Sequence, residues 1–447
     1  MPYTLRTLLS SDEVSTWGLF CGERGFGHRL GDRDRFTRRF LGDPTSAPNR
    51  VIVAVDESIG SRIVGTARLV ERLVTTSTNV ITEMMTTARV VGWADVCSDP
   101  DLRGKGIIGF VLSEAVLRSE ALAASWLKRE NSDVDGTPTA AAAVAIVGVF
   151  ALLHAATGVA GLYERYGFTK GQLKVPCVSL RIEIGGGGGR GGGGEMEGGE
   201  ESGVGGAGAG AEAKGLEAFG STTSTATAAI ALDGLPTTTT TTTAITPTPT
   251  TITAIATDGL PMGTFIRTVD FNSDAIALNV LRRSTLIRCS AVGGIERDVA
   301  YWKQWIPATT RGGALVLVDR NSGEIYAYVS IVAREGVLRV YDWALAAAFA
   351  GGLEGGGIIR ALLSAAVIFA PGFEMGDHSK REVSVVMPMI LARDALGVHV
   401  TLEIDHVLSD DGWMARTLGD ESGAGALNDL YEAAKVGTFL VLAADGF

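Results

Sequence analysis

The segment from Val90 to Leu112 joins an apolar run, a glycine-rich turn and a second apolar run, and reads VVGWADVCSDPDLRGKGIIGFVL. The first run, which ends at Cys97, predicts a buried strand, and the second, which begins at Ile107, predicts a helix. A glycine loop that follows a strand and opens a helix has the local geometry that binds phosphate. Its backbone N–H groups converge on the anion, and the helix N-terminus adds partial positive charge. We therefore expect an anion-binding loop between the two elements.

Two common phosphate motifs fit this loop poorly. Residues Gly104 to Gly109 match G-x-G-x-x-G, but several predicted strands precede the match, and the next strand runs to His154 without a carboxylate. A dinucleotide-binding protein is therefore the least favoured alternative. A nucleoside-triphosphate loop needs Ser or Thr after its lysine, where this chain has Gly106. That class is excluded.

A third phosphate motif fits the whole loop. Residues Pro100 to Ile107, PDLRGKGI, resemble the acyl-CoA loop of the GCN5-related N-acetyltransferases, whose pattern is P-x-x-(Arg/Gln)-x-x-Gly-x-(Gly/Ala). Position 108 departs from this pattern, because the family favours Gly or Ala there and this chain has Ile108. The loop binds through backbone amides, so an isoleucine is compatible if its side chain points into the core.

A second motif lies further along the chain. Residues Leu162 to Phe168, LYERYGF, resemble the L-Y-x-x-x-G-F segment that follows the fifth strand of the family, although Ala156 stands where the family often has Asn. The resemblance covers roughly residues 1 to 184. The segment Gly412 to Met414 and the closing residues Ala443 to Phe447 look similar to fungal lysine N6-acetyltransferases, which carry a degenerate second lobe.

The resemblance implies an α/β (α+β) fold with a central, mostly antiparallel mixed sheet flanked by helices. Residues 1–184 would form the acetyl-CoA-binding catalytic domain, with a last strand from Val175 to Ile184. Residues 185–261 are rich in Gly and Thr and lack apolar periodicity, which predicts a disordered linker or insertion. Residues 262–447 repeat the order of strands, glycine turn and helix, and we expect a second lobe of the same type that does not bind CoA.

The resemblance also implies how the donor would bind. The pyrophosphate would lie on the loop amides, and the acetyl carbonyl would accept a backbone N–H from the end of the preceding strand. The cofactor-binding residues expected on this basis are Val96, Cys97, Ser98, Arg103, Gly104, Lys105, Gly106, Ile107 and Ile108.

Direct attack of an amine on acetyl-CoA in a ternary complex needs two proton transfers. The resemblance implies Tyr163 as the acid that protonates the leaving thiolate. Asp95 is the candidate base, with the carboxylate of Phe447 and a chain of water molecules as alternatives. Cys97 is expected to be a small packing residue, because the transfer needs no acyl-enzyme.

The composition and charge of the chain indicate which classes of partner are expected. The formal net charge of −11 argues against a general nucleic-acid binder. The uncharged segment from Thr139 to Gly161 contains mostly small residues and His154, which predicts a buried strand and a helix rather than a membrane span. The four cysteines are far apart, and the N-terminus has no signal-peptide pattern. Cytoplasmic location is therefore expected, and no metal is expected, because His399 and His406 would not share a metal-binding face.

These patterns together predict an acetyl-CoA-dependent N-acetyltransferase. Its acceptor would be a primary amine, such as free lysine, a similar small amine or a lysine side chain. Two alternatives stay open: a catalytically inactive CoA-binding recognition module, and an aminoglycoside or peptide N-acetyltransferase. The oligomeric state is left open by the sequence.

Overall fold

A computed structural model describes the greater part of the chain. The described residues are 3–27, 34–82, 84–132, 146–156, 158–183, 251–252, 260–310, 313–334, 337–351, 353–369, 382–396, 404–410, 412–418, 421–436 and 438–440. They belong to one compact unit that comprises Met1–Gly186 and Thr248–Phe447. Nearly all of the predicted linker at 185–261 lies outside the described residues.

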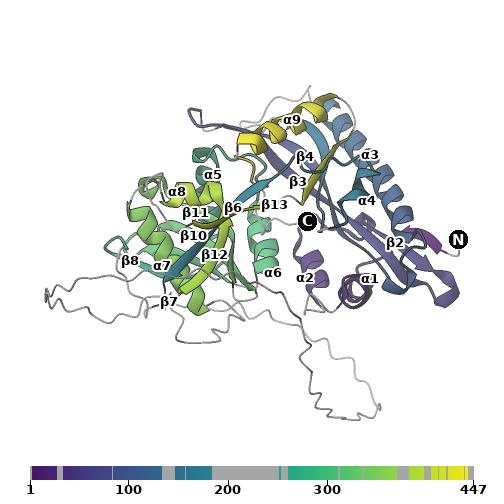
Figure 1. The fold of residues 1–447 in the computed structure, drawn as a ribbon, viewed down its shortest axis with the longest axis horizontal. Coiled ribbons are helices and arrows are strands. Elements are labelled where there is room, and N and C mark those ends of the chain that lie inside the picture. Colours follow the sequence, from purple (N-terminus) through teal and green to yellow (C-terminus); the bar gives the residue numbers. More distant parts are fainter. Residues whose placement is uncertain are drawn as a thin grey trace, which may run out of the picture. The chain divides into compact units, whose positions relative to one another are not determined.

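In the described part of the chain, a first sheet contains six strands in the order β1-β2-β3-β4-β5-β14. Of these, β2, β3 and β4 are labelled in Figure 1. Its strands are β1 (Tyr3–Thr7), β2 (Val51–Asp56), β3 (Arg62–Asn79), β4 (Met84–Ser98), β5 (Ile146–His154) and β14 (Trp413–Thr417). The strands β1 to β4 pair antiparallel in chain order, and β5 lies parallel to β4. The uncharged segment after Thr139 supplies β5, and no described helix is long and apolar enough to cross a membrane.

Helices cover both faces of this sheet. They are α1 (Glu13–Leu19), α2 (Arg35–Gly42), α3 (Ile107–Ser132), α4 (Ala160–Glu164) and α9 (Glu421–Val436). The strand β2 shows why both faces are covered, since all six of its residues are buried. Ile52 and Ala54 join the core beneath α3, while Val51, Val53 and Val55 pack with the aromatic residues of α1 and α2. A continuous apolar run is what a strand between two helical layers requires.

A second sheet has the order β13-β6-β12-β11-β10-β9-β8-β7. Its strands are β6 (Val175–Glu183), β7 (Thr251–Ile252), β8 (Thr264–Thr268), β9 (Ala314–Asp319), β10 (Ile325–Arg334), β11 (Val337–Leu345), β12 (Glu382–Pro388) and β13 (Ile404–Asp410). Its helices are α5 (Ala275–Arg288), α6 (Ile306–Thr310), α7 (Leu353–Phe369) and α8 (Met389–Leu396). The series from β8 to β12 repeats the series from β1 to β5, including one parallel pair, β11 with β12. The predicted fold class, mostly antiparallel mixed sheets flanked by helices, is confirmed.

The two halves of the chain exchange strands. The strand expected to close the first lobe, β6, instead pairs with β12 and β13 in the second sheet, where Val175 and Val178 join the larger core. In turn β14, from near the C-terminus, pairs with β5 in the first sheet. The hydrophobic pattern predicted a strand at β6 but not its partners, and it did not predict β14. The division of the chain at residues 184 and 262 stays a prediction.

The segment from Ile295 to Ile306 becomes helical only at Val299. Residues Tyr301–Trp305 form a π-helical turn that leads into α6. Ile295 instead forms a β-bridge with Val74, and the N–H of Glu296 donates to the carbonyl of Leu73 at 2.8 Å. This pairing holds residues 294–296 along the edge of β3.

Candidate functional site

The predicted anion-binding loop connects β4 to α3. After β4, Pro100–Leu102 form a 3-10 turn, and the carbonyl of Asp99 accepts the N–H of Leu102 at 3.0 Å. The buried Asp99 carboxylate also accepts the N–H of Asp101 at 3.0 Å. Gly104 and Gly106 then adopt φ values of +80° and +78°. Only glycine adopts such angles readily, so these two residues set the path of the loop.

The amides of this loop are placed as a phosphate site requires. The first hydrogen bond of α3 joins the N–H of Phe110 to the carbonyl of Gly106 at 3.0 Å, so the preceding N–H groups have no acceptor within the helix. Within the described residues, no contact occupies the amides of Gly104, Gly106, Ile107 or Ile108. Residues 103–106 are exposed, so the predicted basic side chains Arg103 and Lys105 lie at the surface beside these amides.

The two isoleucines after the loop anchor it to the core. Ile107 is buried and packs against β3 at Gly65, where an added Cβ would lie 2.6 Å from Cγ2 of Ile107. Ile108 is half-buried against the same core. The departure from the family pattern at position 108 is therefore accommodated by packing.

The structure brings the two sequence motifs together. The hydroxyl of Tyr166, in the second motif, donates a hydrogen bond to the carbonyl of Gly109 at 3.0 Å. Phe168 packs edge-on against Trp93 of β4, with ring centroids 4.8 Å apart. Gly167 has φ +83° and ends the short helical turn between them. The second motif thus lies against both the strand and the helix that flank the loop.

The predicted acid Tyr163 lies in the core beneath the first sheet's helices, next to Phe168. Burial, with a smaller contribution from Cys97, raises the pKa of Tyr163 to about 12. Its phenol is therefore protonated throughout the neutral range, which is the form that an acid needs. Cys97 is buried, and the close approach of Gly25 to its sulfur fits the predicted packing role.

The strand β4 changes its pairing before it reaches the loop. Its parallel register with β5 runs from Thr87↔Ile146 to Gly92↔Leu152 in the described residues. Between the pairs Ala94↔Arg68 and Cys97↔Thr66, β4 carries one extra residue, a β-bulge. Beyond Gly92 the strand segment that holds Val96, Cys97 and Ser98 is therefore paired with β3 alone. These are the residues predicted to bind the donor, with a backbone N–H that the acetyl carbonyl would accept.

Asp95 lies at this bulge, with φ +52°. Its carboxylate accepts a hydrogen bond from Nε of Arg68 at 2.6 Å and lies 3.9 Å from Nη1 of Arg39. Its side chain is 3% exposed. The base role predicted for Asp95 stays a prediction, but the carboxylate is committed to two arginines inside the protein.

The ion pairs continue beyond Asp95. Asp43, after α2, pairs with Arg68 at 3.2 Å and with Arg72 at 2.9 Å, and all three side chains are buried. The guanidinium of Arg72 in turn lies over the rings of Tyr301 and Trp305, 5.2 Å from each centroid. These residues were not predicted as functional. One signal was available, because Arg68 and Arg72 lie on the same face of β3 as the apolar Val70 and Val74.

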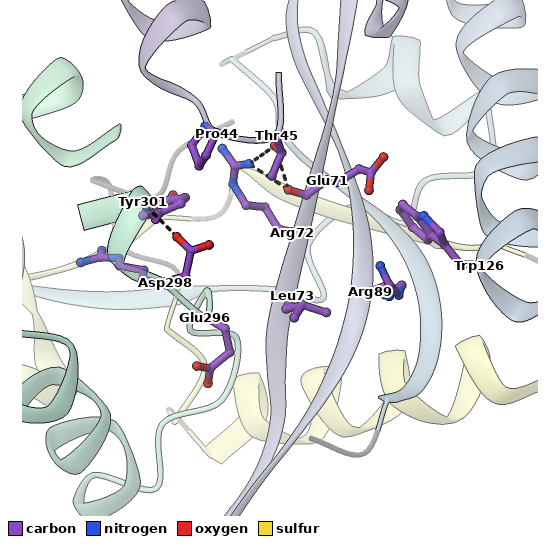
Figure 2. Close-up of a pocket in the computed structure, with 11 residues that line it drawn as sticks. Pro44, Thr45, Glu71, Arg72, Leu73, Arg89, Trp126, Glu296, Asp298 and Tyr301 are labelled. Atoms are coloured by element: carbon purple, nitrogen blue, oxygen red, sulfur yellow. Dashed lines mark hydrogen bonds between the residues drawn. The ribbon is translucent and has the colours of Figure 1, made fainter. Parts of the chain in front are cut away.

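A cavity of about 320 Å³ lies at the edge of β3 where this chain of charges ends. Figure 2 shows Arg72 hydrogen-bonded to Thr45 on one side, with Asp298 and Tyr301 beside it and Trp126 across β3. Trp126 lies far along α3 from the glycine loop, roughly 28 Å from Ile107 at 1.5 Å per residue. The cavity is therefore separate from the loop that would hold a pyrophosphate.

No cluster of His, Cys, Asp or Glu in the described residues could hold a metal ion. His154 pairs instead with Asp410 at 2.6 Å, and His406 lies in β13. His399 and the terminal Phe447 lie outside the described residues.

No protein-family model and no curated protein matches the sequence. Among solved structures, the chain is similar to a GCN5-related N-acetyltransferase from Kribbella flavida, with 14% identity, 95% of this chain and 73% of that chain covered, and a TM-score of 0.48. A GCN5-related N-acetyltransferase from Anabaena variabilis is 12% identical, with 93% of this chain and 73% of that chain covered and a TM-score of 0.45. A third, from Sphaerobacter thermophilus, is 12% identical, with 94% of this chain and 98% of that chain covered and a TM-score of 0.37. At this level of similarity, the activity has to be argued from the residues of this chain.

Proposed function

We propose that this protein is an acetyl-CoA-dependent N-acetyltransferase of the GCN5-related type. The observation that carries the proposal is the contact between its two motifs, in which Tyr166 donates to the carbonyl of Gly109 on the first turn of α3. Chance matches at two distant places in a sequence need not fold against each other. Here they are in direct contact, since Phe168 of the second motif also packs against Trp93 of β4.

The loop supplies the groups that a pyrophosphate needs. The amides of Gly104, Gly106, Ile107 and Ile108 would donate to its oxygens, and the side chains of Arg103 and Lys105 would add charge from the exposed rim. The strand segment from Val96 to Ser98, which β5 leaves unpaired on one edge, would hold the pantetheine and donate an N–H to the acetyl oxygen. Charge that develops on this oxygen during attack is thereby stabilised.

The reaction balances with few groups. The lone pair of the amine forms the new N–C bond, the C–S bond breaks, and its electron pair leaves on sulfur. Tyr163 supplies the proton that the thiolate takes, and the proton that the nitrogen loses after attack restores the phenol. A primary amine has an ordinary pKa near ~10 and must lose a proton before it attacks. For that proton the sequence offers Asp95, the carboxylate of Phe447 and water.

Replacing Tyr163 with phenylalanine tests its role as the acid that protonates the leaving thiolate. We expect kcat to fall by about 100-fold, within the range usual for loss of a general acid, while the dissociation constant for CoA stays within about threefold. Tyr166→Phe is the matched control, since it removes a neighbouring hydroxyl that holds the loop and should weaken CoA binding instead. Parental kcat in Tyr163→Phe would show that Tyr163 is only a packing residue.

The proposed acceptor is a small primary amine such as lysine, or the amine of a lysine side chain. The acidic protein, with a formal net charge of −11, would favour approach of a cation. The test is a mass-spectrometric screen of amino acids, polyamines, aminoglycosides and lysine-containing peptides with acetyl-CoA. A mass gain of one acetyl group on any of these identifies the acceptor class.

Calorimetry on the intact protein separates the remaining alternatives. CoA binding with no turnover on any amine, and no effect of Tyr163→Phe, would favour a recognition module without catalysis. If neither acetyl-CoA nor CoA binds, the proposed function is wrong.

A further inference from the structure

We infer that Asp95 is a positioning residue, which fixes the β4 bulge through Arg68 and Arg39 and so aims the amides after the bulge at the acetyl group. This inference rests on the proposed function, and it assigns Asp95 a role other than that of the base. The amides concerned are those of Val96 and Ser98, one and three residues after Asp95, because the pair Thr66↔Cys97 turns the Cys97 amide towards β3.

The backbone of Asp95 needs such support. Its φ of +52° lies in the left-handed region, which every residue with a side chain adopts at a cost, smaller for Asn and Asp than for the others. A strained residue persists only where its surroundings over-determine it. Here the carboxylate accepts from Nε of Arg68 at 2.6 Å and faces Nη1 of Arg39 at 3.9 Å.

The two arginines that contact Asp95 are fixed in turn by contacts with other residues. Arg68 also pairs with Asp43 at 3.2 Å, and the guanidinium of Arg39 lies 5.3 Å from the ring centroid of Trp305. The contacts come from α2, the turn after it, β3 and the Tyr301–Trp305 turn. The position of Asp95 is thus fixed by elements from both halves of the chain, as expected for a residue that must keep the bulge in one conformation.

The same surroundings exclude the carboxylate from proton transfer with a bound amine. A base must come within hydrogen-bond reach of the proton that it removes. The Asp95 side chain is 3% exposed, and both of its oxygens face guanidinium groups, at 2.6 and 3.9 Å. An acceptor amine would have to displace Arg68 to reach it.

The second sheet provides an internal comparison. Asp342 lies three residues before the end of β11, as Asp95 does in β4, and a bulge falls next to it, between Ser330↔Asp342 and Ile331↔Val340. Its buried carboxylate pairs with Arg297 and lies 3.7 Å from Nε of Arg282. No Arg or Lys lies in the turn from Ala346 to Gly351 after this strand, so this half has no basic phosphate loop. An aspartate held by two arginines therefore belongs to the architecture of both sheets rather than to proton transfer.

The two sheets differ in the residues that come after the aspartate. In β4 the residues after the bulge lead directly into the glycine loop, so the bulge orients amides that touch the donor. In β11 the corresponding residues Trp343 and Ala344 are core. Positioning by Asp95 should therefore matter for catalysis, and positioning by Asp342 for stability alone.

Three variants of the full-length protein test the inference, each with CoA titration, steady-state kinetics and the pH profile of kcat/KM. Asp95→Asn keeps a side chain that tolerates positive φ and accepts from Arg68, and we expect kcat within about fivefold of the parent and an unshifted profile. Asp95→Ala loses both properties, and kcat should fall about 100-fold, the usual effect of misplacing an oxyanion donor, with CoA affinity little changed. Asp342→Asn is the matched control and should keep parental kcat and KM.

If Asp95 were the general base, the three variants would show a different pattern. Asp95→Asn would then be as inactive as Asp95→Ala, and the limb of the pH profile that reports deprotonation would vanish, which overturns the inference. Arg68→Lys gives an independent reading where Asp95→Ala does not fold. It keeps the charge but loses the Nε donor, so kcat should fall although Asp95 is intact, and parental kcat in Arg68→Lys also overturns the inference. A parent protein that does not bind acetyl-CoA would refute the proposed function instead.

Discussion

Replacing Gly106 with valine is expected to weaken acetyl-CoA binding by at least about 100-fold. Gly106 has φ +78°, an angle that a β-branched residue does not adopt without strain, so the loop must change its path. The amides of Gly106 to Ile108 would then turn away from the pyrophosphate. Each hydrogen bond to a charged group contributes about 1.5–3 kcal/mol, so the loss of two accounts for the factor expected. Isothermal titration with CoA measures the change.

A matched control separates this local effect from loss of stability. Gly323, in the turn between β9 and β10, has φ +74°, and an added Cβ would meet nothing within 4 Å, as at Gly106. Gly323→Val therefore imposes the same backbone strain in the sheet that has no phosphate loop. We expect it to lower the melting temperature and leave CoA affinity unchanged. Equal CoA affinity in the two variants would mean that the loop does not bind the donor.

The loop was predictable because everything that forms it is close in sequence. Glycines at 104 and 106 need positive φ, and the apolar residues on either side carry a strand and a helix. The partner of the loop was found only through a resemblance. Nothing in the segment from Leu162 to Phe168 indicates by itself that Tyr166 bonds to Gly109, since this contact spans a helix and a strand.

The strand exchange could not be predicted from local pattern. Both β6 and β14 have the composition of ordinary strands, and alternation of apolar residues says nothing about which sheet they join. Their places are decided by packing between segments more than two hundred residues apart, such as β6 with β12 and β5 with β14. The exchange ties the two halves into one unit and limits how far a domain division can be drawn from sequence.

The buried charges were missed for a related reason. On a strand, charged residues such as Arg68 and Arg72, an even number of positions apart, predict a solvent-facing side. That side is instead covered by α2 and by the turn at Tyr301–Trp305, which are distant in sequence. Burial of these arginines is possible only because Asp43 and Asp95 balance them.

This balance predicts the largest effect on stability. Replacing Asp43 with alanine is expected to lower the free energy of unfolding by about 3–5 kcal/mol, because it leaves Arg68 and Arg72 buried with one carboxylate fewer between them. Chemical denaturation followed by circular dichroism measures the loss. The control is Glu432→Ala, which breaks an exposed pair with Lys435 and should change stability by less than about 0.5 kcal/mol.

The stability of the unaltered protein at low pH should also depend on this network of buried ion pairs. Burial acts to raise the pKa of Asp43, but the ion pair and hydrogen bonds with Arg72, followed by the charge of Arg68, outweigh it and lower the pKa to about 2. The unfolded chain titrates near ~3.9, so the stabilisation from this carboxylate, about 2 kcal/mol, is fully present above that pH and is lost as the pH falls towards 2. Asp43→Asn should therefore lose less stability than the parent between pH 4 and pH 2. Parallel stability curves for the two proteins over that range would mean that Asp43 is not the anchor of the buried arginines, and that the site strand is held by other contacts.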